Sequence, residues 1–142
     1  MSAESSETRS SGSMESARSC NAQGPLLQRA ARARDLAAEA HDARRLAFAL
    51  GTCGLIERFL GRLEEARSSF ESALDHARAC GEPDVVVRAL LNLAGFCLEK
   101  KQPKRVAALL AEARRLAPLL TDPNLRRQLE ALSKWLAGSS GS

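Results

Sequence analysis

Small and apolar residues recur along this chain at intervals of 40 positions. A shift of that length places Ala49 on Ala89 and Ala73 on Ala113. Within each copy the apolar positions are three or four residues apart, which is the spacing of one face of an α-helix. A fixed period of this size, built from helical segments, predicts helix pairs stacked into a short α-solenoid.

The same spacing predicts about six helices joined by short connections. Gly61 and Gly81 are suited to end helices, and Pro83, Pro103 and Pro123 are suited to the first turn of the helices that follow. Short connections force consecutive helices to run antiparallel. The predicted ranges are 25–40, 43–60, 63–80, 83–100, 103–118 and 123–136.

The composition predicts one all-α domain between two polar tails. Residues 1–24 contain eight serines and almost no large apolar side chain, so they should form a disordered Ser-rich tail. Residues 25–137 form the helical repeat domain, and residues 138–142 are expected to be a flexible C-terminal tail. Apart from Val85-Val86-Val87, nothing in the sequence resembles a β-strand.

The charge distribution restricts the kinds of partner. The formal net charge is +4, and residues 99–130 hold eight basic against four acidic side chains. A basic surface attracts acidic peptides, anionic lipids or nucleic acid, whereas the alternative is a solvated face of Arg-rich helices. Few aromatic residues and no nucleic-acid motif disfavour nucleic acid. No apolar run approaches the ~18 residues that a membrane span needs, and the polar N-terminus lacks a secretory signal. We therefore expect a soluble, intracellular protein, cytoplasmic with a nuclear location left open.

The residues that carry catalytic or metal chemistry are not arranged for it. The two histidines, His41 and His76, lie far from the cysteines, and no Cys-x-x-Cys pair provides zinc-ligand spacing. Neither histidine has a nucleophile or an orienting carboxylate in a plausible arrangement. We expect no enzymatic activity, no metal and no cofactor, with the cysteines mostly buried as reduced thiols. The cysteines are Cys20, Cys53, Cys80 and Cys97.

Residues 43–117 resemble tetratricopeptide repeats, in the 40-residue variety found in Pins/LGN-type polarity adaptors and MalT-like regulators. Three features depart from the family pattern: Lys101 stands where an inter-helix glycine is expected, Ala94 replaces a glycine, and most of the family's usual aromatic residues are missing. A generic antiparallel α-bundle, with a 40-residue period that is partly chance, is the alternative fold. The matching segments are 49–54, 61–66 and 70–74 in the first copy, and 89–94 with Val106, Leu110 and Ala113 in the second.

The resemblance implies how the helices are used. The small residue in the first helix of each pair lets the second helix approach closely, and the first helices line a concave face. Residues 25–41 resemble the second helix of a repeat whose first helix is lost, and 122–136 the first helix of a repeat that stops. Carrying the family pattern over gives these groove candidates: Phe48, Thr52, Leu55, Arg58 and Phe59 from one repeat, and Arg88, Leu91, Asn92, Leu98 and Glu99 from the next.

Arg88 and Asn92 are the strongest polar candidates for binding a partner. They are four residues apart and share one helical face. Asparagine can donate to and accept from a peptide backbone, and arginine can clamp a carboxylate with two hydrogen bonds. The alternative is that Asn92 bonds within its helix pair and Arg88 is solvated. The family's clamp for chaperone C-termini is not expected, because Phe48 and Thr52 stand where it needs polar or basic groups.

The leading hypothesis is a scaffold or adaptor that holds a partner peptide or helix in the concave groove. A second hypothesis is an assembly module, because Leu26, Leu27 and Leu36 lie at an end of the solenoid with no helix before it. Self-association, or docking onto a larger complex, would cover that end. A third is that the chain is a short isoform or fragment of a longer repeat protein.

Overall fold

The computed structural model describes residues 24–141. The Ser-rich tail predicted for residues 1–24 lies almost wholly outside this range, as does Ser142. The described chain is all-α, with six α-helices and one short 3-10 helix and no strand between residues 24 and 141, which confirms the predicted fold class. The elements are α2 (Gly24–Glu39), α3 (Ala43–Phe59), α4 (Leu63–Cys80), α5 (Pro83–Glu99), α6 (Pro103–Leu116), η1 (Ala117–Leu119) and α7 (Pro123–Gly141).

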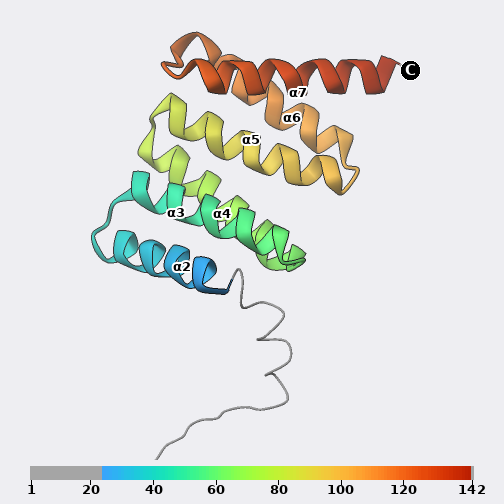
Figure 1. The fold of residues 1–142 in the computed structure, drawn as a ribbon. Coiled ribbons are helices and arrows are strands. Elements are labelled where there is room, and N and C mark those ends of the chain that lie inside the picture. The colour runs from blue at the N-terminus through green and yellow to red at the C-terminus, as the bar shows by residue number, and fades with distance from the viewer. Residues whose placement is uncertain (1–23, 142) are drawn as a thin grey trace, which may run out of the picture.

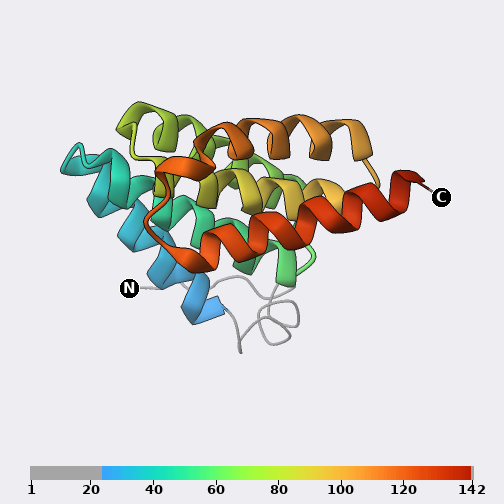
Figure 2. The same ribbon diagram turned by 90° about the horizontal axis from the view of Figure 1, so that it is seen from above.

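Consecutive helices run in opposite directions and stack side by side (Figure 1). Helices α3, α5 and α7 form one layer, and α4 and α6 lie behind them in a second layer (Figure 2). The most extensive contacts join α3 to α4, α2 to α3, α5 to α6 and α4 to α5, and a smaller contact joins α6 to α7. Helices α3, α5 and α7 also contact one another in turn. This is an α-solenoid of antiparallel pairs with one face made by α3, α5 and α7.

The turns between helices recur at a regular interval along the chain, one after each of α2, α3, α4 and α5. Positive φ angles occur there at His41, Gly61, Gly81 and Lys101, with values of 54°, 83°, 78° and 57°. After α3, the amides of Gly61 and Arg62 donate to the carbonyls of Arg58 and Glu57 at 3.1 and 2.8 Å. After α5, the amides of Lys101 and Gln102 donate to the carbonyls of Leu98 and Cys97, both at 3.0 Å. These are Schellman closures, so the lysine takes the left-handed turn that the sequence pattern assigns to glycine.

Replacing Lys101 with glycine is expected to raise the free energy of unfolding by about 0.5–1 kcal/mol. A side chain with a Cβ is strained in the left-handed region, and glycine is not. The reciprocal Gly61→Lys variant, at the equivalent turn, should lower the free energy of unfolding by a similar amount. Urea unfolding followed by circular dichroism measures both. Unchanged stability in both variants would contradict the expected strain.

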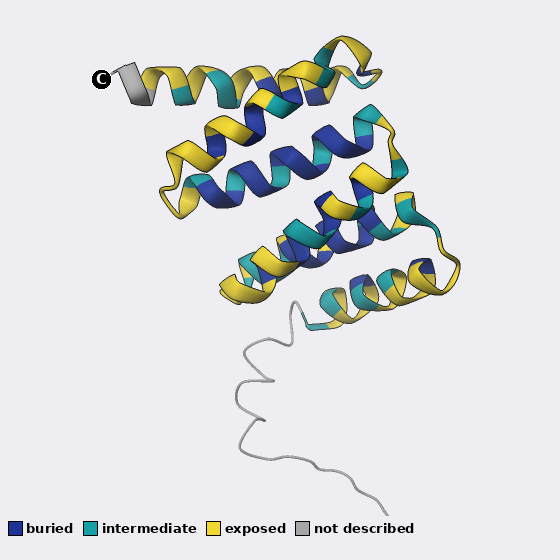
Figure 3. Ribbon diagram, turned by 180° about the vertical axis from the view of Figure 1, so that it is seen from behind, coloured by how far each residue is buried: buried dark blue, intermediate teal, exposed yellow. Residues whose placement is uncertain are grey.

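The core is centred on α5. Ten of its residues are buried, more than in any other described helix, and its ribbon in Figure 3 is dark blue with teal intervals. The rings of Phe70 and Phe96 pack at a centroid distance of 5.8 Å across the α4–α5 boundary. Helix α5 is therefore the element that fixes the positions of the helices on either side of it.

The close approach of α3 and α4 depends on Gly54. A Cβ built on Gly54 would lie 2.7 Å from Cδ1 and Cε1 of Phe70, so no larger residue fits without movement of the ring. This is the role that the repeat resemblance implied for the small residue of the first helix. At the equivalent positions of the next repeat, the second pair has Ala94 and Leu110, both fully buried in the same core. In the second pair, alanine replaces glycine on the first helix and leucine replaces phenylalanine on the second, so a larger residue faces a smaller one.

Two boundaries differ from the sequence-based ranges. Helix α6 ends at Leu116 and gives way to η1, because Pro118 has no amide hydrogen to donate to the carbonyl of Arg114 and so cannot continue the α-helical hydrogen bonds. The predicted flexible C-terminal tail, 138–142, is helical as far as Gly141. Once a helix is nucleated, each further residue adds a hydrogen bond at little cost. The C-terminal boundary of the repeat domain at residue 137 therefore does not coincide with a helix end.

Candidate functional site

A hollow of about 260 Å³ lies on the face made by α3, α5 and α7. We call it the central hollow. Phe48, Arg88 and Gln128 line it and come one from each of these helices, at positions separated by one full repeat of the sequence. The repeat thus places equivalent positions of three successive helices around one concavity. Its larger lining side chains are Phe48, Thr52, Leu55, Arg88, Asn92 and Gln128.

Arg88 is held at the hollow but is not saturated with hydrogen bonds. Its Cζ lies 5.3 Å from the centroid of the Phe48 ring, a cation–π distance. Its Nη2 is 3.7 Å from Oδ2 of Asp122, which is too long for a hydrogen bond. Its Nε is buried and has no acceptor among the described residues. Arg88 therefore keeps donor capacity while an aromatic ring and an opposite charge fix its place.

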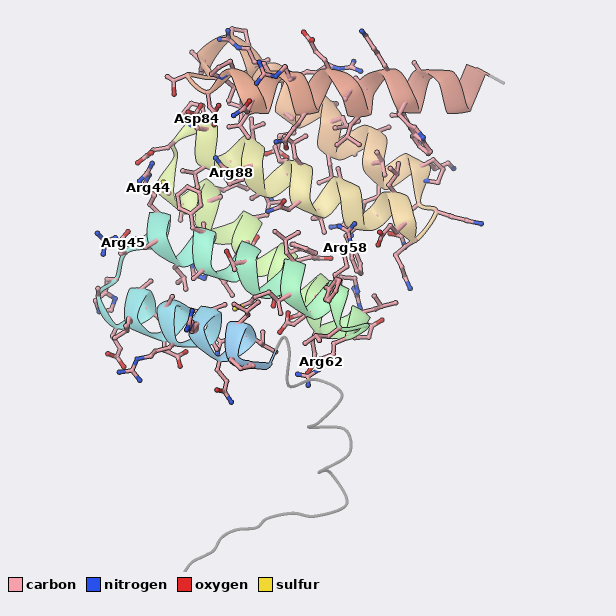
Figure 4. The ribbon with its side chains drawn as sticks, in the orientation of Figure 1. Arg44, Arg45, Arg58, Arg62, Asp84 and Arg88 are labelled. Atoms are coloured by element: carbon pink, nitrogen blue, oxygen red, sulfur yellow. The ribbon has the colours of Figure 1, made fainter. Side chains whose placement is uncertain are left out.

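A second arginine, Arg44, contacts Phe48 and Glu82. Its Cζ is also 5.3 Å from the Phe48 centroid, and its Nε donates to Oε1 of Glu82 at 3.0 Å. Figure 4 shows Arg44, Arg88 and Asp84 gathered at the same end of the α3–α5 pair, with Arg58 towards the other end. Two guanidinium groups therefore lie against the Phe48 ring at this end, and each has a carboxylate beside it, Glu82 for Arg44 and Asp122 for Arg88.

Asn92 faces α3 across the hollow. A Cβ on Gly51 would lie 3.2 Å from Nδ2 of Asn92, so the absence of a side chain at Gly51 leaves room for the amide. Asn92 is half-buried, and it lies one helical turn from Arg88 on the same face. The structure therefore brings the two predicted polar residues together in one hollow.

The hydroxyl of Thr52 is used inside its own helix. Its Oγ1 donates to the carbonyl oxygen of Phe48 at 3.1 Å. Thr52 therefore offers the groove its methyl group and an acceptor, and not a free donor.

The remaining candidates lie in a second hollow of about 390 Å³ lined by Leu55, Arg58, Phe59 and Glu99. We call it the distal hollow. Arg58 Nη2 and Glu99 Oε2 form an ion pair at 2.8 Å between α3 and α5. Phe59 is 73% exposed, more than any other large hydrophobic residue described. Leu55 lines both hollows, so they adjoin along α3 and α5, and we call the two together the groove.

Two predicted groove residues do not belong to this surface. Leu91 is buried in the core with 5% exposure, and Leu98 is partly buried against that core. Leu91 is adjacent to Asn92 in sequence, and so points about 100° away from it around the helix. Because α5 is surrounded by α3, α4, α6 and α7, that direction leads into the core and not to the groove.

The sequence-based set missed Gln128 and Arg44. Gln128 could have been found, because it lies one repeat after Arg88 and so occupies the same position in the next copy. Arg44 could have been found too, because it lies four residues before Phe48 and so shares its helical face.

The start of α7 is fixed to the start of α5 beside this site. Asp84 accepts hydrogen bonds from the hydroxyl and the amide of Thr121. These bonds lower the pKa of Asp84, with the side-chain hydroxyl as the larger cause. The hydrogen bonds between Thr121 and Asp84 hold the adjacent Asp122 near Arg88.

Two of the three cysteines described are buried, and Cys80 is partly buried. Cys53 and Cys97 are 0% and 2% exposed, and burial raises the pKa of both thiols. They are therefore poor nucleophiles. Cys20 lies outside the described residues.

Comparisons with models of protein families, with curated proteins and with solved structures found no match to this chain. Among the helices described, none has the length and hydrophobicity that crossing a membrane requires.

Proposed function

We propose that this chain is a non-catalytic protein-interaction module that holds a peptide or helix of a partner protein in the groove along α3, α5 and α7. The observation that carries the proposal is Arg88, which is fixed at the central hollow and has a buried Nε without an acceptor among the described residues. Leaving a buried donor unpaired costs about 1–3 kcal/mol, and a bound acceptor that rearranged the guanidinium could recover part of that cost.

The two hollows suggest which chemistry the partner brings. At the central hollow, Arg88 and Asn92 favour a carboxylate or backbone carbonyl. Toward the distal hollow, Leu55 and the exposed ring of Phe59 favour an apolar side chain. We therefore infer a peptide with an acidic group followed by an apolar one.

The regularly repeated helix pairs, the Gly54–Phe70 contact and the resemblance to tetratricopeptide repeats support the same proposal, since such solenoids present concave binding surfaces. An intracellular, cytoplasmic location is part of this proposal.

The test is selection of ligands for the full chain from a library of random peptides, followed by affinity measurement by fluorescence anisotropy. The double variant Arg88→Ala/Asn92→Ala is expected to bind a selected peptide about 10- to 100-fold more weakly, because both polar anchors are lost. Circular dichroism verifies that the variant is folded.

A matched control removes one guanidinium and one amide from the other layer. Arg105 and Gln102 lie at the start of α6, and both are exposed. The Gln102→Ala/Arg105→Ala variant should bind with the parent affinity. If the two double variants bind equally well, the groove is not the binding site.

A further inference from the structure

Another concavity, mostly apolar and of about 440 Å³, lies between α2 and α3 and adjoins the central hollow at Phe48 and Thr52. We call it the α2–α3 furrow. Leu36, on α2, lines it and is 54% exposed, and Leu26 on the same helix is 50% exposed. The furrow is lined chiefly by Ala33, Leu36 and Ala40 from α2 and its C-terminal turn and by Phe48, Ala49 and Thr52 from α3.

The two ends of the solenoid differ in how much apolar surface they expose. Helix α7 closes one end (Figure 1) and buries Leu125 and Leu129 against the stack. Its exposed positions are mostly polar, with the half-exposed Trp135 as the large exception. At the opposite end, α2 packs on α3 and buries Ala30 and Ala37, but leaves exposed an apolar stripe that contains Leu26, Ala33 and Leu36. A solenoid end of this kind is usually covered, because apolar terminal faces reduce solubility.

The preceding segment of the chain is poorly suited to cover the furrow. A helix in that place would stand one repeat before α3, in the position of a first helix. The residues one repeat before Leu46, Leu50 and Cys53 are Ser6, Ser10 and Ser13. Serine at all three positions does not supply the apolar face that α3 uses.

The charges on α2 are complementary to those of a second α2 running antiparallel. Arg32 and Glu39 are seven residues apart, so they lie on the same edge of the apolar stripe. Both are exposed, and the nearby ion pairs join Arg34 to Asp35 and Arg45, a charged residue that lines the furrow, to Asp42. In an antiparallel pair of helices that meet at Leu36, Arg32 of each copy lies opposite Glu39 of the other. One two-fold arrangement therefore makes two reciprocal ion pairs and brings the two Leu36 side chains together.

We propose that the α2–α3 furrow is the interface of a two-fold dimer, in which α2 of a second copy of this chain lies antiparallel along it. Helix α2 has 16 residues and is about 24 Å long. With α3 beside it, the face is roughly 500 Å² per copy, or about 1,000 Å² in total, below the ~1,200 Å² at which stable interfaces begin. The dimer is accordingly weak, with a Kd of about 1–100 µM.

The test is sedimentation equilibrium of the full chain at low salt, over concentrations from about 1 to 200 µM. Arg32→Glu and Glu39→Arg each replace two attractions by two repulsions, and each variant alone should dimerise about 10-fold or more weakly than the parent. An equimolar mixture of the two variants should form a heterodimer with both ion pairs restored. The double variant Arg32→Glu/Glu39→Arg should dimerise like the parent.

An apolar substitution supplies a second, independent readout. Leu36→Glu should abolish dimerisation, whereas Leu119→Glu is the control, since Leu119 is 60% exposed on η1. Because none of these substitutions touches the central or distal hollow, peptide binding should be retained in every variant.

Three results would overturn the proposal. The first is a strict monomer across the concentration range. The second is a dimer that the charge reversals do not weaken or that the mixture of variants does not restore. The third is a full-length monomer that dimerises only after removal of residues 1–23, which would assign the furrow to that segment.

Discussion

Replacing Phe70 with alanine is expected to lower the free energy of unfolding by about 3–5 kcal/mol. Phe70 is fully buried on α4, where its ring packs against Phe96 of α5 and the backbone of α3 at Gly54. Its removal leaves a cavity where three helices meet. Domains of this size are typically stable by about 5–15 kcal/mol, so the loss is a large part of the total. Urea unfolding followed by circular dichroism measures it.

Phe59 provides the matched control, because it is the same residue type at 73% exposure. Phe59→Ala should change the free energy of unfolding by no more than about 0.5 kcal/mol. A loss below about 1 kcal/mol for Phe70→Ala would contradict the enclosed position described for the ring.

The Gly54→Ala substitution is expected to cost about 1–3 kcal/mol, because the new methyl group would overlap the Phe70 ring. The second helix pair shows which substitution would relieve this overlap, since it has Ala94 and Leu110 at the positions equivalent to Gly54 and Phe70. Adding Phe70→Leu to Gly54→Ala should therefore cost at least about 1 kcal/mol less than the sum of the two single substitutions. A double-mutant cycle by urea unfolding measures this coupling.

Gly95→Ala is the control for the glycine substitution. Its Cβ would lie 3.8 Å from Nη1 of Arg58, an ordinary contact. Alanine also favours the helix over glycine by about 1 kcal/mol, so this variant should be as stable as the parent or more so. Additive effects of Gly54→Ala and Phe70→Leu would show that the two residues do not constrain each other.

Most of the fold could be predicted because local chemistry marks the helix ends. Pro83, Pro103 and Pro123 each stand at the first residue of a helix, and Gly61 and Gly81 adopt positive φ. Where such markers are weak, the prediction was less accurate. Nothing in the sequence of residues 137–141 distinguishes a short helical extension from a tail.

The groove was predictable as far as one helical face could be assigned. Arg88 and Asn92 fall together because they are one turn apart, whatever the neighbouring helices do. Leu91 was placed wrongly because α5 has neighbours on several sides, and its sequence does not show which of its apolar residues remain exposed. The partly open α2 end was indicated by Leu26 and Leu36, but the furrow itself depends on how α2 packs on α3.

All the extensive helix contacts within residues 24–141 join helices that are next to each other or next but one along the chain. No extensive contact among the described residues joins α2 directly to α7. The curvature of the groove is therefore the sum of small rotations at each interface between helices. We therefore expect the stack to bend by small changes distributed over all its helix interfaces. A ligand slightly longer or shorter than the resting groove can be accommodated by elastic bending of the whole stack, with no hinge and no refolding of any single helix.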